Sequence, residues 1–233
     1  MSANTQELRN VVLLGHSDSG KTTLIETMLY EGGAIKRRGS VEGQNTVSDY
    51  TDLEHEKGKT IFSHQMFVKW KNNKINIIDT PGFDDFVGEV VSSLKVADTA
   101  IIVLNAANGV EVGTEIVWEY VEKYQTPAIF VINQIDHPKA DFERTLEQAK
   151  ERFGSKLVPV QYPYNTGAEF NAIIDALRMV MYEFPANGGK PEKKPIPESE
   201  MARANEMHNA LVEIAAENEE GLMEKYFEEG NLS

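Results

Sequence analysis

Eight residues near the start of this chain decide its fold: Gly15-His16-Ser17-Asp18-Ser19-Gly20-Lys21-Thr22. They match the phosphate-loop pattern G-x-x-x-x-G-K-[ST], in which backbone N–H groups and a helix N-terminus surround a phosphate. An apolar run, residues 11–14, precedes the motif, and a helix-like run, residues 22–30, follows it. This context predicts a phosphate site, with Lys21 on the β- and γ-phosphates and the Thr22 hydroxyl as a Mg²⁺ ligand.

Length and composition suit one α/β domain with an insertion, because 233 residues that are 41% hydrophobic can bury a large core. The net charge of −14 argues against wrapping long nucleic acid, although it leaves a local contact with RNA open. The absence of cysteine excludes disulfides and thiolate metal sites. Since no apolar run approaches a membrane span, we expect a cytoplasmic protein that contacts no membrane.

Apolar runs at residues 11–14, 75–78, 100–104 and 128–132 predict buried strands, and residues 61–70 predict a more exposed strand that turns at 71–74 into the next. Helical patterns lie between the later runs, near residues 86–96, 113–124 and 140–153. This alternation predicts an α/β fold with a mostly parallel sheet and helices on both faces. Ligands of such sheets bind at the carboxyl ends of the strands.

The pattern loosens after residue 156. We expect a short strand at 157–161, a helix at 169–182, an exposed loop at 186–197 and a further helix from residue 198. In that last helix Ala204, Met207, Leu211 and Ile214 share one face, which predicts packing on its own domain. Another apolar cluster follows it: Leu222, Met223, Tyr226 and Phe227.

Asp79-Thr80-Pro81-Gly82 follows the predicted strand at 75–78. A carboxylate at this place can hold Mg²⁺ opposite Thr22, and the Gly82 N–H can meet a γ-phosphate. Thr60 ends a long irregular stretch, residues 31–59, and a stretch of that length is often functional. Its hydroxyl could complete the Mg²⁺ shell, so Thr22, Thr60 and Asp79 form the predicted metal site.

Asn133-Gln134-Ile135-Asp136 follows the predicted strand at 128–132. The Asp136 carboxylate can accept hydrogen bonds from guanine N1–H and N2–H₂, whereas adenine offers no such pair of donors. Asn133 can tie this loop to the phosphate loop. Of the five histidines, we expect His16 to be structural and the other four to lie at surface or polar-edge positions, because they share no metal-site spacing.

These motifs together resemble the guanine-nucleotide domain of the translational GTPases, most closely that of elongation factor G. The first motif, residues 15–24, includes Thr23, and residues 54–61 resemble a switch segment that ends at Thr60. The resemblance implies GTP or GDP and Mg²⁺ as cofactors, and a ribosome, with its RNA and proteins, as the partner of the full-length factor. It further implies a GTP-binding core at residues 1–156 and the beginning of the family's insertion at 157–233. We expect a monomer.

Four positions depart from the family pattern. Phe83 stands where the family has the histidine that orients the attacking water, and Phe83 has no hydrogen-bonding atom. Ser17 and Lys59 replace the two apolar side chains that gate that histidine, and Gln134 replaces a lysine. Lys21, Thr60 and position 83 are therefore the predicted catalytic positions, with slow hydrolysis, because lost water positioning costs roughly 10²–10⁴ in rate.

The family closes its guanine pocket with a Ser-Ala loop that does not occur before Ser233. The loop Asn165-Thr166-Gly167-Ala168 is a weaker substitute, so we expect the chain to be a fragment with reduced guanine affinity. The main interpretation is a GTPase domain of a translation elongation factor that acts in translocation. The alternatives are a switch that works by GTP occupancy without effective hydrolysis, a ribosome-protection factor, and a phosphate-loop kinase or ATPase.

Overall fold

The computed structural model describes residues 5–48, 50–82, 86–155, 157–186 and 189–217. The chain forms two compact units. The first consists of Met1–Gln134 and Glu143–Arg152, and the second of Ile135–Phe142 and Phe153–Ser233. The phosphate loop and the strands that surround it all belong to the first unit.

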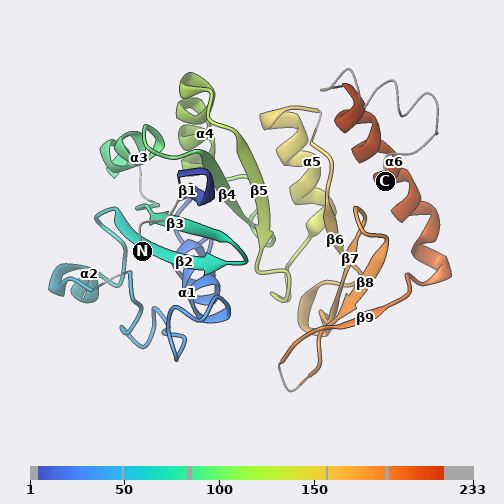
Figure 1. The fold of residues 1–233 in the computed structure, drawn as a ribbon, viewed down its shortest axis with the longest axis horizontal. Coiled ribbons are helices and arrows are strands. Elements are labelled where there is room, and N and C mark those ends of the chain that lie inside the picture. Colours follow the sequence, from blue (N-terminus) through green and yellow to red (C-terminus); the bar gives the residue numbers. More distant parts are fainter. Residues whose placement is uncertain (1–4, 49, 83–85, 156, 187–188, 218–233) are drawn as a thin grey trace. The chain divides into compact units, whose positions relative to one another are not determined.

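The first unit is built on a five-stranded sheet in the order β2-β3-β1-β4-β5 (Figure 1). The strands β3, β1, β4 and β5 run parallel, and only β2 is antiparallel to its neighbour. Their bounds are β1 Leu8–Leu14, β2 His64–Trp70, β3 Asn73–Asp79, β4 Thr99–Asn105 and β5 Ala128–Asn133. The predicted α/β class and mostly parallel sheet are therefore confirmed.

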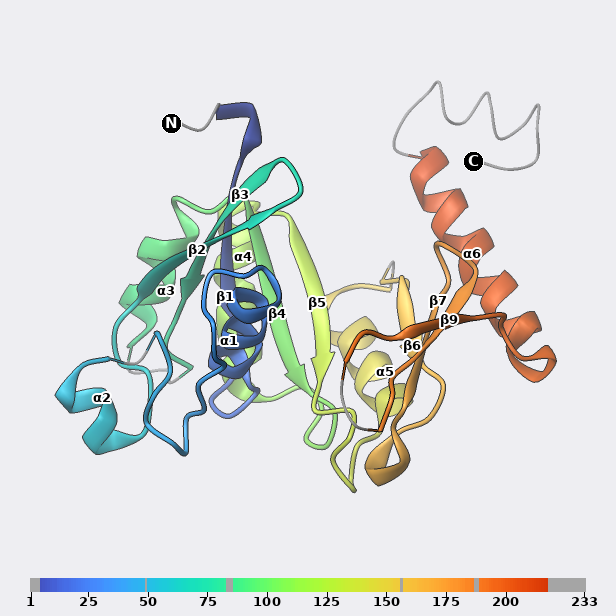
Figure 2. The ribbon, with the colours of Figure 1, turned by 60° about the horizontal axis from the view of Figure 1, so that its bottom comes forward.

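Helices cover both faces of this sheet. Ile25 and Leu29 of α1 (Lys21–Glu31) are buried against Leu13, Ile77 and Val103 of the central strands. Successive strand residues face opposite sides, so the residues between these point to the other face. There α3 (Val87–Leu94) packs on β1 and α4 (Val112–Tyr124) on β4. Figure 2 shows α1 in front of the sheet and α4 behind it. A further helix, α5 (Phe142–Phe153), follows β5.

The second unit holds an antiparallel sheet in the order β6-β7-β8-β9, followed by α6 (Glu198–Glu217). Its strands are β6 Gln161–Pro163, β7 Ala172–Asp175, β8 Val180–Glu183 and β9 Glu192–Lys194. The helix predicted at 169–182 is wrong, because β7 and β8 form a hairpin there. The Asp175 carboxylate accepts the Arg178 N–H at 2.8 Å and Met179 adopts a left-handed φ of 51°, which turns the chain back.

Two smaller expectations also fail in this unit. The strand predicted at 157–161 begins only at Gln161, and the loop expected at 186–197 contains β9. The helix from residue 198 is confirmed as α6, although Ala204, Val212 and Ala216 are its most buried residues, rather than the whole predicted face. The cluster at residues 222–227 lies outside the described residues.

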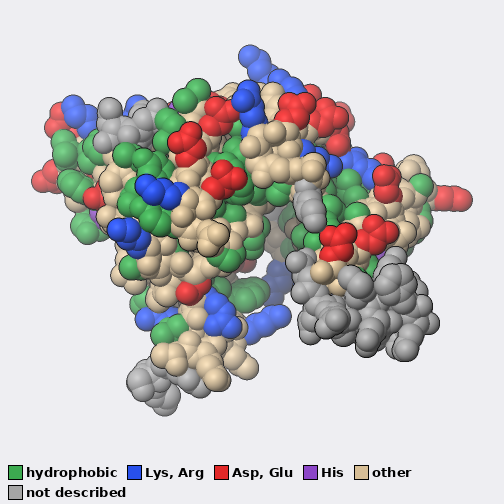
Figure 3. Space-filling model, turned by 90° about the horizontal axis from the view of Figure 1, so that it is seen from above, with side chains coloured by type: hydrophobic (Ala, Val, Ile, Leu, Met, Phe, Trp, Pro, Cys, Tyr) green, Lys and Arg blue, Asp and Glu red, His purple; other side chains and the backbone are tan. Residues whose placement is uncertain are grey.

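Figure 3 shows acidic, basic and apolar side chains interspersed on one face of the molecule, with no continuous basic surface there. No helix within the described ranges has both the length and the apolar character needed to cross a bilayer.

The segment between α1 and β2 is anchored by two buried carboxylates. Glu26 of α1, 1% exposed, accepts the Gly39 N–H at 2.9 Å and also accepts the Val47 N–H. Glu54 lies in α2 (Asp52–Lys57), a short helix within the stretch that the sequence predicted as irregular. Since Thr60 lies between α2 and Ile61, whose N–H donates to Glu54, the Glu54 carboxylate helps to fix where Thr60 lies.

Glu54 binds the chain on both sides of α2. Thr51 caps the helix and donates its hydroxyl to Glu54 at 2.8 Å, while the N–H groups of Ile61 and Phe62 donate to the carboxylate at 3.0 and 3.2 Å. These N–H groups are thereby taken from strand pairing, so β2 begins at His64 rather than at the predicted residue 61. His64, on the edge strand β2, is buried with Nε2 at 2.8 Å from Glu54, so of the two expected positions, surface or polar edge, the surface one is excluded.

Burial of the Glu54 side chain raises its pKa, but hydrogen bonds from Ile61, His64, Thr51 and Phe62 outweigh burial and lower the pKa to about 2. A carboxyl whose pKa is depressed in the folded state stabilises the fold above its unfolded pKa and loses that contribution as the pH falls toward the folded pKa. The stabilisation by Glu54 is therefore complete near neutral pH and declines from about pH 4.5 to about pH 2.

We predict that Glu54→Gln lowers the free energy of unfolding at pH 7 by about 2 kcal/mol, because a neutral amide accepts these hydrogen bonds less strongly and turns a donor toward them. Urea unfolding at pH 7 and at pH 3 measures this. The difference between the variant and the native chain should shrink at pH 3. A difference that is the same at both pH values would contradict the role given to the Glu54 charge.

Candidate phosphate-binding site

The phosphate loop connects β1 to α1 at the carboxyl edge of the sheet. Gly20 precedes the first residue of α1 with a left-handed φ of 90°, and a Cβ there would lie 2.4 Å from Asn133 Nδ2. Only glycine permits both this backbone angle and this close approach. The Asn133 side chain indeed donates to the Ser19 carbonyl at 2.9 Å, so the predicted tie between the two loops is confirmed.

Lys21 is 6% exposed although it carries a charge. Its ammonium donates to the carbonyls of Gly15 at 3.0 Å and His16 at 2.9 Å, which curls the side chain back over the loop. The ammonium is thereby buried against the loop, at the place where the backbone N–H groups of a phosphate loop surround an anion. This arrangement is suited to a phosphate anion.

The three predicted metal ligands lie together. Thr22 donates its hydroxyl to Asp79 Oδ2 at 2.9 Å, and the hydroxyl oxygens of Thr22 and Thr60 are 3.3 Å apart. Asp79 ends β3 and is fully buried. Oxygen ligands from two hydroxyls and one carboxylate are the kind that Mg²⁺ prefers, and it usually adds phosphate oxygens and water. This donor set, beside Lys21, therefore fits a magnesium nucleotide.

The segment after Asp79 packs on the phosphate loop. Thr80 donates its hydroxyl to the Leu13 carbonyl at 2.6 Å, and Pro81 is buried. A Cβ on Gly82 would lie 2.7 Å from Ser17 N and 2.6 Å from Lys21 Nζ, so no side chain fits between this backbone and the loop. Phe83, the next predicted position, lies outside the described residues.

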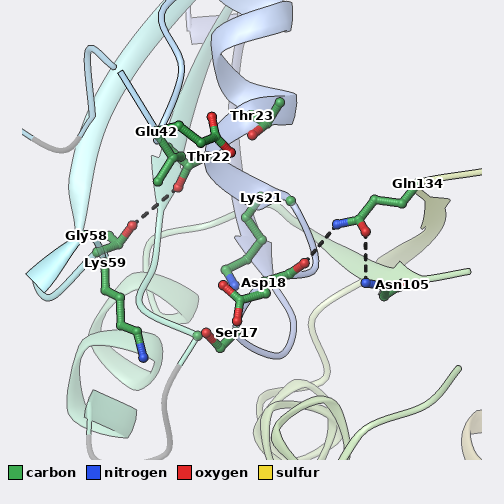
Figure 4. A pocket seen from close by; sticks show the side chains of 14 residues that line it. Ser17, Asp18, Lys21, Thr22, Thr23, Glu42, Gly58, Lys59, Asn105 and Gln134 are labelled. Carbon is green, nitrogen blue, oxygen red and sulfur yellow. Dashed lines mark hydrogen bonds between the residues drawn. The ribbon is translucent and has the colours of Figure 1, made fainter. Parts of the chain in front are cut away.

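A cavity of about 390 Å³ lies beside these groups, within the size range of small-molecule sites. Figure 4 shows Ser17, Lys21 and Lys59 around it. Ser17 and Lys59, the two polar replacements, thus line the same cavity as Thr22 and Thr60. Asp18, Thr23, Gly82 and Gln134 contribute to its wall as well.

The predicted base-reading loop is divided between the two units. Gln134 belongs to the first unit and lines the cavity, whereas Asp136 belongs to the second and is exposed there. Within the second unit Gly167 donates its N–H to the Ile135 carbonyl at 2.8 Å. The loop at 165–168, the weaker substitute for the missing Ser-Ala loop, is therefore bonded to the loop that carries Asp136.

Sequence reasoning missed Asn105, Val41 and Glu42, which also line the cavity. Asn105 could have been found, because it ends the apolar run 100–104 just as Asp79 and Asn133 end theirs. Polar residues at the carboxyl ends of neighbouring parallel strands meet at one edge of the sheet. Val41 and Glu42 carry no such signal, since they lie in the irregular segment.

Comparison with known proteins gives consistent matches. Residues 6–231 match the model of the elongation factor Tu GTP binding domain. Elongation factor G of Mycoplasma pneumoniae is 41% identical over 97% of this chain, and an elongation factor G-like protein of Thermotoga maritima is 35% identical over 96%. A crystal structure of a Thermus thermophilus protein superposes with a TM-score of 0.87 and 33% identity, covering 94% of this chain and 33% of that protein.

The chain spans 33% of the length of the Mycoplasma pneumoniae relative and 31% of the Thermotoga maritima relative. The match to the family model, in contrast, runs through the phosphate loop, the Asp79 segment and the Asn133 loop. Together with the geometry of the site, it shows that this chain belongs to the elongation factor Tu GTP binding domain family of translational GTPases.

Proposed function

We propose that this chain binds GTP with Mg²⁺ and serves as the nucleotide domain of a translation elongation factor similar to elongation factor G. The observation that carries the proposal is the meeting of Thr22, Thr60 and Asp79 oxygens beside the buried Lys21 ammonium. These groups come from three separate segments of the chain. Their meeting in one place is therefore more specific than the phosphate-loop motif alone.

In this proposal the amides of residues 15–22 and the Lys21 ammonium hold the β- and γ-phosphates. The Gly82 N–H would meet the γ-phosphate, which would let the chain respond to whether that phosphate is present. Bound Mg²⁺ would neutralise phosphate charge between the hydroxyls and Asp79. On the base, Asp136 accepts the two guanine donors, and the bond between Gly167 and Ile135 supports the loop that presents it.

Hydrolysis is proposed to be slow. Phe83 cannot orient a water molecule, and Ser17 and Lys59 supply polar groups where the family has an apolar gate. Lys21, the loop amides and Thr60 remain to stabilise charge, which keeps GTP bound without positioning the attacking water. The chain would then act chiefly by GTP occupancy.

Further proposals concern the whole factor. We propose the ribosome, through its RNA and proteins, as the partner that reads the GTP state, in a cytoplasmic protein whose nucleotide domain is monomeric. Residues 1–156 would be the GTP-binding core and residues 157–233 the beginning of an insertion. A ribosome-protection factor shares this nucleotide domain and remains the alternative within the family.

We expect the chain to bind GTP and GDP in the presence of Mg²⁺ and to bind ATP much more weakly, because adenine leaves Asp136 without donors. Isothermal titration with each nucleotide, with and without Mg²⁺, measures this.

Thr22→Ala should weaken Mg²⁺-dependent GTP binding by about tenfold or more. Thr27→Ala is the control, since the Thr27 hydroxyl is exposed on the same helix and bonds only locally to the Thr23 carbonyl. Equal binding of ATP and GTP would instead favour a phosphate-loop kinase or ATPase.

A second prediction concerns the missing water-orienting group. Phe83→His should raise the GTPase kcat in the presence of ribosomes by roughly 10²-fold or more, within the range of a restored general base. Phe67→His, at a half-exposed position of β2, should leave kcat unchanged. Phosphate release under saturating GTP measures both. Native turnover that already matches an ordinary elongation factor G would refute slow hydrolysis.

A further inference from the structure

Asn105 is a buried polar residue at the end of β4 that none of the motifs assigns. In the sheet register it pairs with Asn133 of β5, so it lies directly beside the start of the base-reading loop. Its side chain is 6% exposed and lines the same cavity as Gln134. A buried carboxamide at this place needs partners for both its oxygen and its nitrogen.

Those partners form one continuous chain of hydrogen bonds. The N–H groups of Ala107 and Asn108 donate to Asn105 Oδ1 at 2.8 and 3.4 Å. Asn105 Nδ2 then donates to Gln134 Oε1 at 3.0 Å, and Gln134 Nε2 donates to the Asp18 carbonyl at 2.8 Å. Figure 4 shows Gln134 lying between Asn105 and Asp18 in this way.

The two ends of this series of hydrogen bonds fix which group donates and which group accepts in each bond. Backbone N–H groups can only donate, and the Asp18 carbonyl can only accept, so neither carboxamide can be turned over without facing donor to donor or acceptor to acceptor. The Gln134 carboxamide is thereby held at both ends where it lines the cavity. Without Asn105, its carboxamide oxygen would lose the partner that fixes its plane.

We propose that Asn105 is a positioning residue that holds the Gln134 carboxamide as one face of the guanine site. This inference rests on the proposed GTP binding. Lysine at position 134 would keep its contact with Asp18 through the ammonium, but it would turn a donor toward Asn105 Nδ2. Asn105 and Gln134 therefore work as a matched neutral pair, in which each side chain requires the chemistry of the other.

The test is a cycle of three variants of the full chain, titrated with GTP and with GDP in Mg²⁺. Asn105→Asp keeps an acceptor for Ala107 and Asn108 but removes the donor to Gln134, and Gln134→Lys removes the acceptor for Asn105. Each single variant should bind both GTP and GDP about 3- to 10-fold more weakly, which is the range expected from the loss of one neutral hydrogen bond. The double variant should regain native affinity or exceed it, because the ammonium then donates both to the new carboxylate and to Asp18.

Asn108→Ala is the matched control. Its carboxamide lies in the same turn but bonds Glu111 at 3.2 Å and not Gln134, so affinity should not change. The proposal would be overturned if the fold-losses in nucleotide affinity of the two single variants simply multiplied in the double variant. It would also be overturned if Asn105→Asp kept the native affinity, or if affinity fell for GTP but not for GDP. If Asn105→Asp fails to fold, Gln134→Met provides the test, and unchanged affinity for both nucleotides would then overturn it. A native chain that binds no guanine nucleotide refutes the proposed function itself, before any variant is compared.

Discussion

The hydrogen bond from Thr22 to Asp79 is the interaction on which the site depends, because it joins the two segments between which the phosphate must lie. Asp79 is fully buried, and a buried carboxylate is costly unless polar groups surround it. The parallel register sets Asp79 level with Leu13, so the end of β3 lies at the start of the phosphate loop. The Thr80 hydroxyl, which donates to the Leu13 carbonyl, likewise holds the end of β3 beside the start of the phosphate loop. A shift of β3 by one residue would turn the Asp79 side chain to the other face of the sheet, away from Thr22.

Much of the first unit could be predicted from sequence because its signals are local and strong. Each buried strand is a continuous apolar run, and a polar residue follows three of the four runs at the carboxyl end, as Asp79 and Asn133 do. The rule that such ends meet at one edge is sufficient to bring Thr22, Asp79 and Asn133 together. The need for glycine at position 20 could be predicted as well, because the motif has a glycine where the backbone and Asn133 leave no room for a side chain.

The rest depends on contacts that no local pattern announces. Residues 172–183 contain apolar residues at spacings that fit a helix as well as a hairpin, and the hairpin forms because β6 and β9 supply edges to pair with. Glu26 and His64 look like ordinary polar positions in the sequence. They are buried because backbone groups from the segment between α1 and β2, and the Glu54 carboxylate, come to meet them. Asn105 does carry a local signal, since it ends an apolar run, but its hydrogen-bond partner Gln134 is distant in sequence and no local pattern pairs the two.

Glu26 and Glu54 also reduce the conformational freedom of the chain between α1 and β2. A long flexible loop loses conformational entropy when its far end is brought to a fixed point, and the loss grows with loop length. Here Glu26 closes one loop at Gly39 and another at Val47, and Glu54 closes a third across α2. Thr60 therefore follows several short loops, each closed by hydrogen bonds, and not one long flexible segment. Part of the entropy cost of bringing its hydroxyl to Thr22 is therefore met when the chain folds, before any ligand binds.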